Sequence, residues 1–160
     1  MSTPALILVR HGQSTANATH LIKAACQTAL GQRSHLDIFG TDYDTPDGTC
    51  LRDYIHVSDL IAAHVDGLRH LRRGGESGVF NCGYGKGYSV LEVISAVEKA
   101  HGGPIKVNRT SRRPGDSVAV VAGAARVREI LGWKPNHEDI DLIVASALAW
   151  ERRLAQRNAA

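Results

Sequence analysis

"IFGTDYDTPDGTCLRDYIHVSDL", residues 38–60, contains in one run a strand end, a turn, an extended segment and the start of a helix. The apolar segment 36–40, "LDIFG", predicts a short strand, and a Pro-Asp-Gly sequence supplies the turn of the loop that follows it. Residues 50–57, "CLRDYIHV", predict a second extended segment. This segment leads into a helix, which we expect Ser58 and Asp59 to cap.

The rest of the chain alternates in the same way between apolar strand-like runs and amphipathic helical segments. The pattern predicts further strands at 5–9, 78–82 and 105–108, and further helices at 19–31, 89–103, 124–133 and 140–156. Ser89 and Glu92 have the spacing of a capping box at the start of one of these helices. The alternation predicts an α/β fold with a helix-rich C-terminal end.

Composition limits the classes of partner. The 160 residues are 43% hydrophobic and 22% charged, which is typical of one soluble globular domain. The formal charge of +3 is small and the arginines are scattered in short pairs, so we expect a small anionic ligand rather than a nucleic acid. No apolar run is long enough for a membrane span, and we expect a cytoplasmic protein with no membrane partner. Cys26, Cys50 and Cys82 lack zinc or redox spacing, so we expect free thiols and no metal site.

Residues 5–17, "ALILVRHGQSTAN", resemble the opening motif of histidine phosphatases. In that family a histidine after the first strand attacks phosphorus, and nearby arginines neutralise the phosphate oxygens. The resemblance implies this role for His11. A second histidine motif is also required, and its one candidate, "HGG" at 101–103, follows a predicted helix and is better explained as a helix C-terminus. A small phosphatase that uses His11 remains an alternative.

A second resemblance is much longer. The run 38–60 resembles the UDP-glucose 4-epimerase family of extended short-chain dehydrogenase/reductases. The same resemblance continues in "GQSTANATHLIKAACQTALG" (12–31), "GVFNCGYGKGYSVLEVISAV" (78–97), "RRPGD" (112–116) and "REILGWKP" (128–135). It implies an α/β fold that is the substrate-binding C-terminal part of a truncated family member, with a short N-terminal strand and the Rossmann half largely absent.

The resemblance also implies the residues that hold a UDP-sugar. The family segment beside the pyrophosphate and uridine falls on His20, Leu21 and Ile22, with a histidine where the family has an asparagine. The strand that flanks the uracil falls on Asp37, Ile38 and Phe39. Phe39 has two interpretations, since it suits either a stacking contact with a base or the hydrophobic core.

Two arginines complete the implied site. Arg52 in "LRDYIHV", and Arg113 with Asp116 in "RRPGD", fall on family positions at the pyrophosphate. Two guanidinium groups can each grip phosphate oxygens through paired hydrogen bonds. The alternative is that Arg52 pairs with a neighbouring aspartate and Arg113 is merely solvated. A tyrosine that some family members have near the sugar is Val120 here, which leaves the sugar preference open.

The catalytic residues of the family are missing from this chain. In the family, NAD takes a hydride from the sugar while the tyrosine of a Tyr-x-x-x-Lys pair removes a proton. None of the four tyrosines is followed by a lysine four residues later. The loop 83–87, "GYGKG", lacks the spacing of a dinucleotide fingerprint, and we interpret it as a tight connection. We therefore assign no catalytic residue, and NAD is a cofactor only by resemblance, since its binding half is not present in this chain.

Together these observations predict three parts: an N-terminal strand of uncertain origin (1–17), a UDP-sugar-binding region (18–155) and a tail (156–160). The resemblance implies a chain of nucleotide-sugar and galactose metabolism that binds a UDP-sugar weakly without turnover. A non-catalytic nucleotide-sugar-binding module is a further alternative. Without a Rossmann half, an apolar face would be uncovered, so we expect either a homodimer or a marginally stable chain.

Overall fold

The computed structural model describes residues 7–11 and 15–159 of the chain. Its helices are α1 (Thr15–Ala29), α2 (Val57–Arg72), α3 (Val90–His101), α4 (Ala125–Leu131) and α5 (Ile140–Ala159). Its strands are β1 (Ile7–His11), β2 (Leu36–Phe39), β3 (Leu51–Arg52), β4 (Gly78–Cys82), β5 (Tyr88–Ser89), β6 (Val107–Thr110) and β7 (Ala119–Val120).

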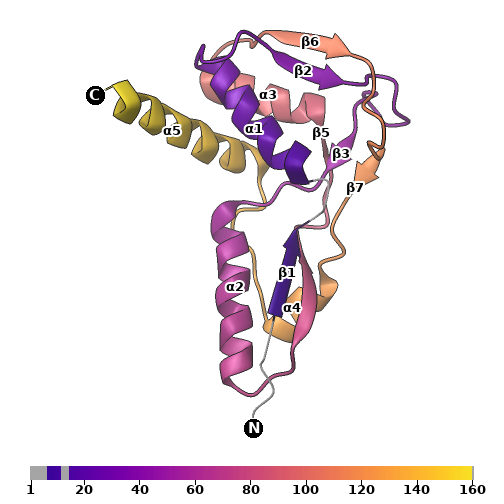
Figure 1. Ribbon diagram of the computed structural model, residues 1–160, viewed down its shortest axis with the longest axis vertical. Coiled ribbons are helices and arrows are strands. Elements are labelled where there is room, and N and C mark those ends of the chain that lie inside the picture. Colours follow the sequence, from indigo (N-terminus) through magenta and orange to yellow (C-terminus); the bar gives the residue numbers. More distant parts are fainter. Residues whose placement is uncertain (1–6, 12–14, 160) are drawn as a thin grey trace.

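The strands form three short sheets within these residues. Strand β1 pairs with β4 and β2 pairs with β6, both in parallel, while β3 lies between antiparallel β5 and parallel β7. Figure 1 shows that α1, α3, α5, β2 and β6 form an upper lobe, and that α2, α4, β1 and β4 form a lower lobe. The predicted α/β class is confirmed.

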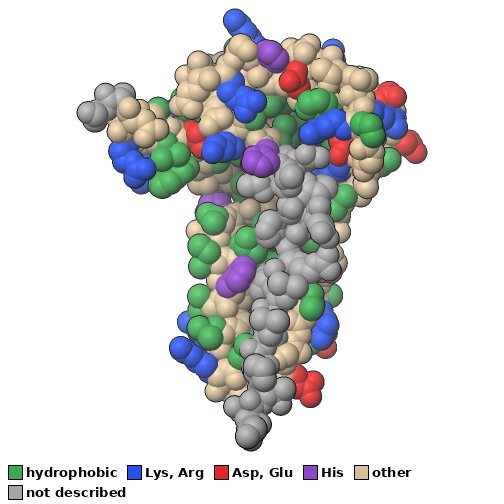
Figure 2. All heavy atoms as spheres, in the orientation of Figure 1, with side chains coloured by type: hydrophobic (Ala, Val, Ile, Leu, Met, Phe, Trp, Pro, Cys, Tyr) green, Lys and Arg blue, Asp and Glu red, His purple; other side chains and the backbone are tan. Residues whose placement is uncertain are grey.

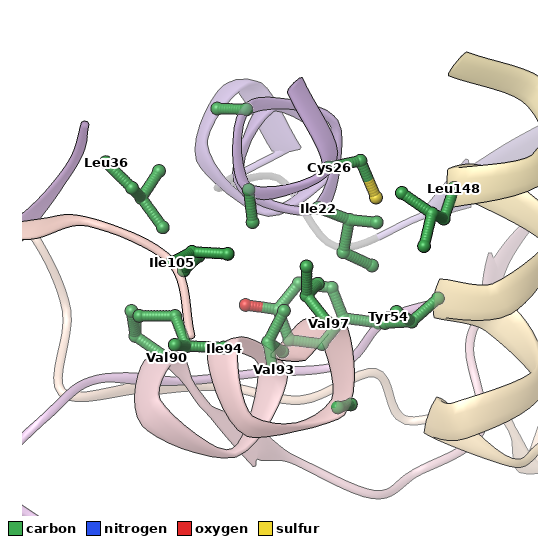
Figure 3. Close-up of a cluster of buried hydrophobic side chains, with 14 of the residues drawn as sticks. Ile22, Cys26, Leu36, Tyr54, Val90, Val93, Ile94, Val97, Ile105 and Leu148 are labelled. Carbon is green, nitrogen blue, oxygen red and sulfur yellow. The ribbon is translucent and has the colours of Figure 1, made fainter. Parts of the chain in front are cut away.

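Each lobe has its own hydrophobic core. In the upper core, side chains of α1, α3 and α5 converge with Tyr54, as Figure 3 shows. The fully buried Val93 and Val97 of α3 lie near its centre. The lower core is smaller and is built around Phe80 and Trp133, which are 2% and 1% exposed. Tyr84 packs against both cores, so the two lobes are joined through this residue.

Several boundaries differ from those expected. The helix expected at 19–31 is α1 and begins earlier, at Thr15, while the helix expected at 140–156 is α5 and continues to Ala159. The extended segment expected over 50–57 contains only a two-residue strand, and its partners β5 and β7 were not predicted. The strand expected at 105–108 lies at Val107–Thr110. Two-residue strands lack a periodic signal, because alternation needs several residues to be recognised.

The cap of α2 corrects the expectation for Ser58 and Asp59. The N-cap residue is His56, whose ring nitrogen Nδ1 accepts a hydrogen bond from the Ser58 N–H at 3.1 Å. Ser58 therefore donates its backbone N–H to the N-cap residue and is not itself the N-cap. Asp59 is 1% exposed and its carboxylate contacts residues outside the helix, as described below.

The capping box of α3 is confirmed and supports a stability prediction. Ser89 Oγ accepts a hydrogen bond from the Glu92 N–H at 3.0 Å, and the Glu92 side chain accepts from the Ser89 N–H at 2.7 Å. Ser89 also donates to the Asp47 carboxylate.

We expect Ser89→Ala to lower the free energy of unfolding by about 1–2 kcal/mol in urea denaturation. The exposed Ser95 of the same helix is the control. Ser95→Ala should change the free energy of unfolding by less than about 0.5 kcal/mol. Equal effects of the two variants would contradict this prediction.

Candidate functional site

A small cavity of about 40 Å³ in the upper lobe brings together most of the residues implied by sequence. Six of the eight predicted site residues line it, together with three that sequence reasoning missed. The lining residues are Leu21, Asp37, Phe39, Cys50, Arg52, Tyr54, Val90, Arg113 and Asp116.

Strand alternation explains which residues of β2 reach the cavity. Successive side chains of a strand point to opposite faces. Asp37 and Phe39 therefore share the face that lines the cavity. Ile38 points the other way, is 1% exposed and belongs to the upper core. Its side chain does not line the cavity, although the resemblance named it with its two neighbours.

The same alternation identifies two cavity residues that the sequence analysis missed. Cys50, Arg52 and Tyr54 occupy every second position around β3 and all line the cavity. Taking every second residue on either side of Arg52 would have identified both Cys50 and Tyr54. Val90, the third missed residue, is the first residue of α3 and gave no comparable signal.

His20 and Leu21 differ in their placement. Leu21 lines the cavity, whereas His20 is exposed and is not among the lining residues. Consecutive residues of α1 point about 100° apart, so only one of such a pair can face a given site. Val120, on β7, is half-buried and also lies outside the lining.

Arg52 is buried and held by the backbone. Its Nη1 donates to the carbonyl oxygens of Leu51 at 2.7 Å and Ser117 at 2.9 Å, and its side chain is 4% exposed. Nη2 lies 3.7 Å from the carboxylate of Asp116, itself 11% exposed. The pairing with an aspartate that we weighed as an alternative is therefore present, and it fixes the guanidinium at the cavity.

Arg113 lines the same cavity with a partly exposed side chain. Its guanidinium carbon is 3.8 Å from the ring centroid of Phe39, a cation–π contact, and its Nε is 3.5 Å from the Asp116 carboxylate. The side chain is 44% exposed. Arg52 and Arg113 thus share one carboxylate, so the cavity is lined by two cations and the anion between them.

Two buried polar atoms at this cavity have no hydrogen-bond partner among the described residues: Arg52 Nε and the Tyr54 hydroxyl. Each residue is 3% exposed overall. Burial raises the pKa of Tyr54, so the hydroxyl keeps its proton. Burial also raises the pKa of the half-buried Cys50 thiol. Unpaired buried donors cost free energy, and these donors are suited to a ligand with acceptor oxygens.

A second polar cluster lies between the two cores and was not predicted. Asp59 in the first turn of α2 accepts hydrogen bonds from the Tyr84 hydroxyl at 2.8 Å and from the N–H groups of Asn136 and His137. His137 Nδ1 also donates to it at 2.7 Å. Burial disfavours the charged carboxylate, but the hydrogen bonds outweigh it and lower the pKa of Asp59. Its acceptors are thus fully used within the protein.

The glycine loop 83–87 does not provide a dinucleotide site. The Asp53 carboxylate accepts from the N–H groups of Tyr84 at 3.0 Å and Gly85 at 2.8 Å, the donors that a phosphate would need. A Cβ at Gly83 would lie 2.6 Å from this carboxylate, so glycine is required there for close packing. The interpretation of the loop as a tight connection agrees with these contacts. This loop therefore does not fit the phosphates of NAD.

A larger cavity of about 380 Å³ lies at the far end of α2. It is lined by Asp66, Arg69, His70, Arg73, Gly75, Ile130 and Leu131. Its cations belong to the end of α2, where positive charge stabilises a helix C-terminus. We assign it no ligand.

Across the described residues there is no cluster of three or more side chains suited to a metal ion. In the same part of the chain, no helix combines the length and hydrophobicity needed to cross a bilayer. On the face in Figure 2, basic side chains lie over both lobes without forming one continuous patch.

Comparison with known proteins gives a consistent set of similarities. Residues 8–83 match the model of the NAD dependent epimerase/dehydratase family. A UDP-glucose 4-epimerase of Azospirillum brasilense is 61% identical over 147 residues, covering 92% of this chain and 42% of that protein. One of Halalkalibacterium halodurans is 44% identical, covering 89% of this chain and 43% of that protein.

Solved structures agree with the sequences. The UDP-Glc/GlcNAc 4-epimerase of Campylobacter jejuni superposes with a TM-score of 0.83 at 42% identity, over 93% of this chain and 49% of that one. A UDP-glucose 4-epimerase of Bifidobacterium longum, in complex with NAD+ and UDP, has a TM-score of 0.81 at 40% identity, over 93% and 48%. The chain spans about half or less of the length of these relatives, and it resembles their C-terminal part.

None of these similarities supports the phosphatase resemblance of residues 5–17. His11 ends β1, but its side chain lies outside the described ones. His101 is the last residue of α3, and Gly102 is its left-handed C-cap with φ of 90°. The "HGG" sequence is therefore a helix terminus, as expected.

Proposed function

We infer that the chain belongs to the NAD dependent epimerase/dehydratase family and corresponds to the C-terminal part of a UDP-glucose 4-epimerase. From that premise we propose that it carries the nucleotide half of a UDP-sugar site, in the cavity beside β2 and β3. The observation that carries the proposal is the convergence of Arg52, Arg113 and Phe39 on one cavity.

Binding of a UDP-sugar would use the charges already in place. The diphosphate would replace Asp116 as the ion-pair partner of Arg113, since phosphate oxygens pair well with guanidinium groups. Arg52 would supply the buried cation, and its unpartnered Nε is a spare donor. Because Arg113 now covers the face of Phe39, its movement would uncover the ring for the uracil. The cavity of about 40 Å³ would widen by the same movement.

The proposed activity of the chain by itself is weak binding without epimerisation. No tyrosine of the chain is followed by a lysine four residues later, and the 83–87 loop does not fit a dinucleotide. Ligand pockets also bind well only when most of the ligand surface is covered. The wider role would be in nucleotide-sugar and galactose metabolism in the cytoplasm. A phosphatase reaction at His11 is not part of this proposal.

A homodimer remains part of the proposal. Helix α2 directs the small residues Ala63 and Gly67 inward, while larger apolar side chains lie on its outer face. This stripe, Val57, Ile61, Val65 and Leu68, is 62%, 57%, 41% and 49% exposed. Exposed apolar stripes are typical of protein contacts. Sedimentation at several concentrations would measure the assembly.

The binding proposal is tested by calorimetric titration with UDP-glucose. We expect saturable binding that Arg113→Ala weakens by about 10- to 100-fold, since a charge-assisted hydrogen bond contributes about 1.5–3 kcal/mol. Arg113 is half-exposed, so the variant should fold. Arg112→Ala is the matched control, because Arg112 pairs with Asp42 at 2.7 Å on the outside.

Two outcomes would contradict the proposal: no saturable binding by the folded chain, or equal loss in the Arg112 and Arg113 variants. Adding NAD to the titration should leave the affinity for UDP-glucose unchanged. A dependence on NAD would mean that the chain holds the cofactor, contrary to the contacts of the 83–87 loop.

A further inference from the structure

The polar cluster between the two cores is not used by the proposed nucleotide site. We call it the junction cluster and define it as His56, Asp59, Tyr84, His137 and Ser146. His56 and Asp59 belong to the start of α2 in the lower lobe, and Ser146 belongs to α5 in the upper lobe. His56 Nε2 and Ser146 Oγ are 3.0 Å apart. The cluster therefore fastens a helix of one lobe to a helix of the other.

The hydrogen bonds of His56 define its protonation state. The Ser58 N–H donates to Nδ1 at 3.1 Å, so Nδ1 carries a lone pair. Nε2 then carries the proton and donates to Ser146 Oγ, which in turn donates to the Ile143 carbonyl at 2.8 Å. This chain of bonds fits only a neutral imidazole. A second proton would sit on Nδ1, opposite the Ser58 N–H, and would abolish the cap of α2.

The groups around His56 have opposing effects on its pKa. The His137 ring stacks on it with centroids 4.4 Å apart and planes at 14°. His137 Nδ1 donates to the Asp59 carboxylate at 2.7 Å. Burial and His137 lower the pKa of His56, while the Asp59 carboxylate raises it. The Tyr84 hydroxyl is neutral, and at the rim Glu138 is paired with Arg128 at 3.0 Å.

We propose that the junction cluster is an acid-sensitive latch between the two lobes. It is closed while His56 is neutral, and it opens when the imidazole takes up a proton, which frees Ser146 and α5 from the start of α2. The open state leaves His56 in water with an ordinary pKa near 6.5, so it binds the proton more tightly than the closed state. Falling pH therefore favours opening.

The fluorescence of Trp133 can report the opening of the latch. It is 1% exposed, and its Nε1 donates to the Asp59 carbonyl at 2.9 Å. The chain has two tryptophans, and the other, Trp150, is 57% exposed. Trp150→Phe therefore leaves Trp133 as the single reporter. Between about pH 8 and pH 4.5 we expect a reversible red shift and stronger acrylamide quenching, with a midpoint below about 6.5. The far-UV circular dichroism should be retained.

The variant that tests the assignment is His56→Asn in the Trp150→Phe background. Asparagine is a good N-cap but does not titrate, so the fluorescence transition should disappear from this pH range. His64→Asn is the control, since His64 is an exposed histidine of the same helix. The proposal falls if His56→Asn keeps the transition at its original midpoint. It also falls if circular dichroism is lost together with the red shift, because the event is then global unfolding.

Hydrogen exchange of the unaltered chain gives a test that does not depend on a variant. After correction for intrinsic rates, acid should release the amide protons of Ser58, Asn136 and His137 before those of the buried turns of α3. Simultaneous release would overturn the latch. Neither measurement involves a nucleotide, so the latch and the proposed binding site can fail independently.

Discussion

Asp59→Ala is expected to lower the free energy of unfolding by about 3–5 kcal/mol, because the change removes a buried charge whose partners stay behind. The Tyr84 hydroxyl, the N–H groups of Asn136 and His137 and the His137 ring would all lose their acceptor. Each buried donor left unpaired costs about 1–3 kcal/mol. The measurement is urea denaturation at neutral pH, followed by circular dichroism.

Asp66→Ala on the same helix is the control for this variant. Asp66 pairs with Arg69 at 3.0 Å, and the arginine is 64% exposed. A pair of this kind contributes about 1 kcal/mol or less. A similar loss in both variants would mean that Asp59 contributes no more than a surface carboxylate, and the role of the junction cluster in joining the cores would be wrong.

Trp133→Ala is expected to cost about 3–5 kcal/mol, the range for a large aromatic side chain removed from a core. Trp133 is 1% exposed in the lower core, and it also donates to the Asp59 carbonyl. The lower core is small, so few neighbours can move into the space that the indole leaves. Thermal or urea denaturation measures the loss.

Trp150→Ala provides a matched comparison within the same chain. Trp150 is 57% exposed on α5, so its removal should change stability by about 0.5 kcal/mol or less. If Trp150→Ala were equally destabilising, the outer face of α5 would be buried in the protein in solution. That outcome would point to an assembly through α5.

Most of the residues that line the small cavity of the upper lobe were predictable from sequence, because they lie in short runs around two turns. The "LDIFG" and "CLRDYIHV" runs gave Asp37, Phe39 and Arg52, and "RRPGD" gave Arg113 and Asp116. Alternation within an extended segment could have added Cys50 and Tyr54. Whether these runs converge depends on the pairing of β2 with β6 and of β3 with β7. Neither pairing has a local signal.

The sequence by itself determined the α/β class, the helices α1, α3 and α5, and the similarity of the long run around 38–60 to UDP-glucose 4-epimerases. These follow from periodicity and motif, which are local properties of the chain. Only the tertiary structure decided that Asp59 serves the junction between the cores instead of capping its own helix. Its partners Tyr84 and His137 are 25 and 78 residues away. A buried polar side chain needs hydrogen-bond partners from the protein, because water is excluded. The short stretch of sequence around Asp59 does not indicate which distant residues will supply them.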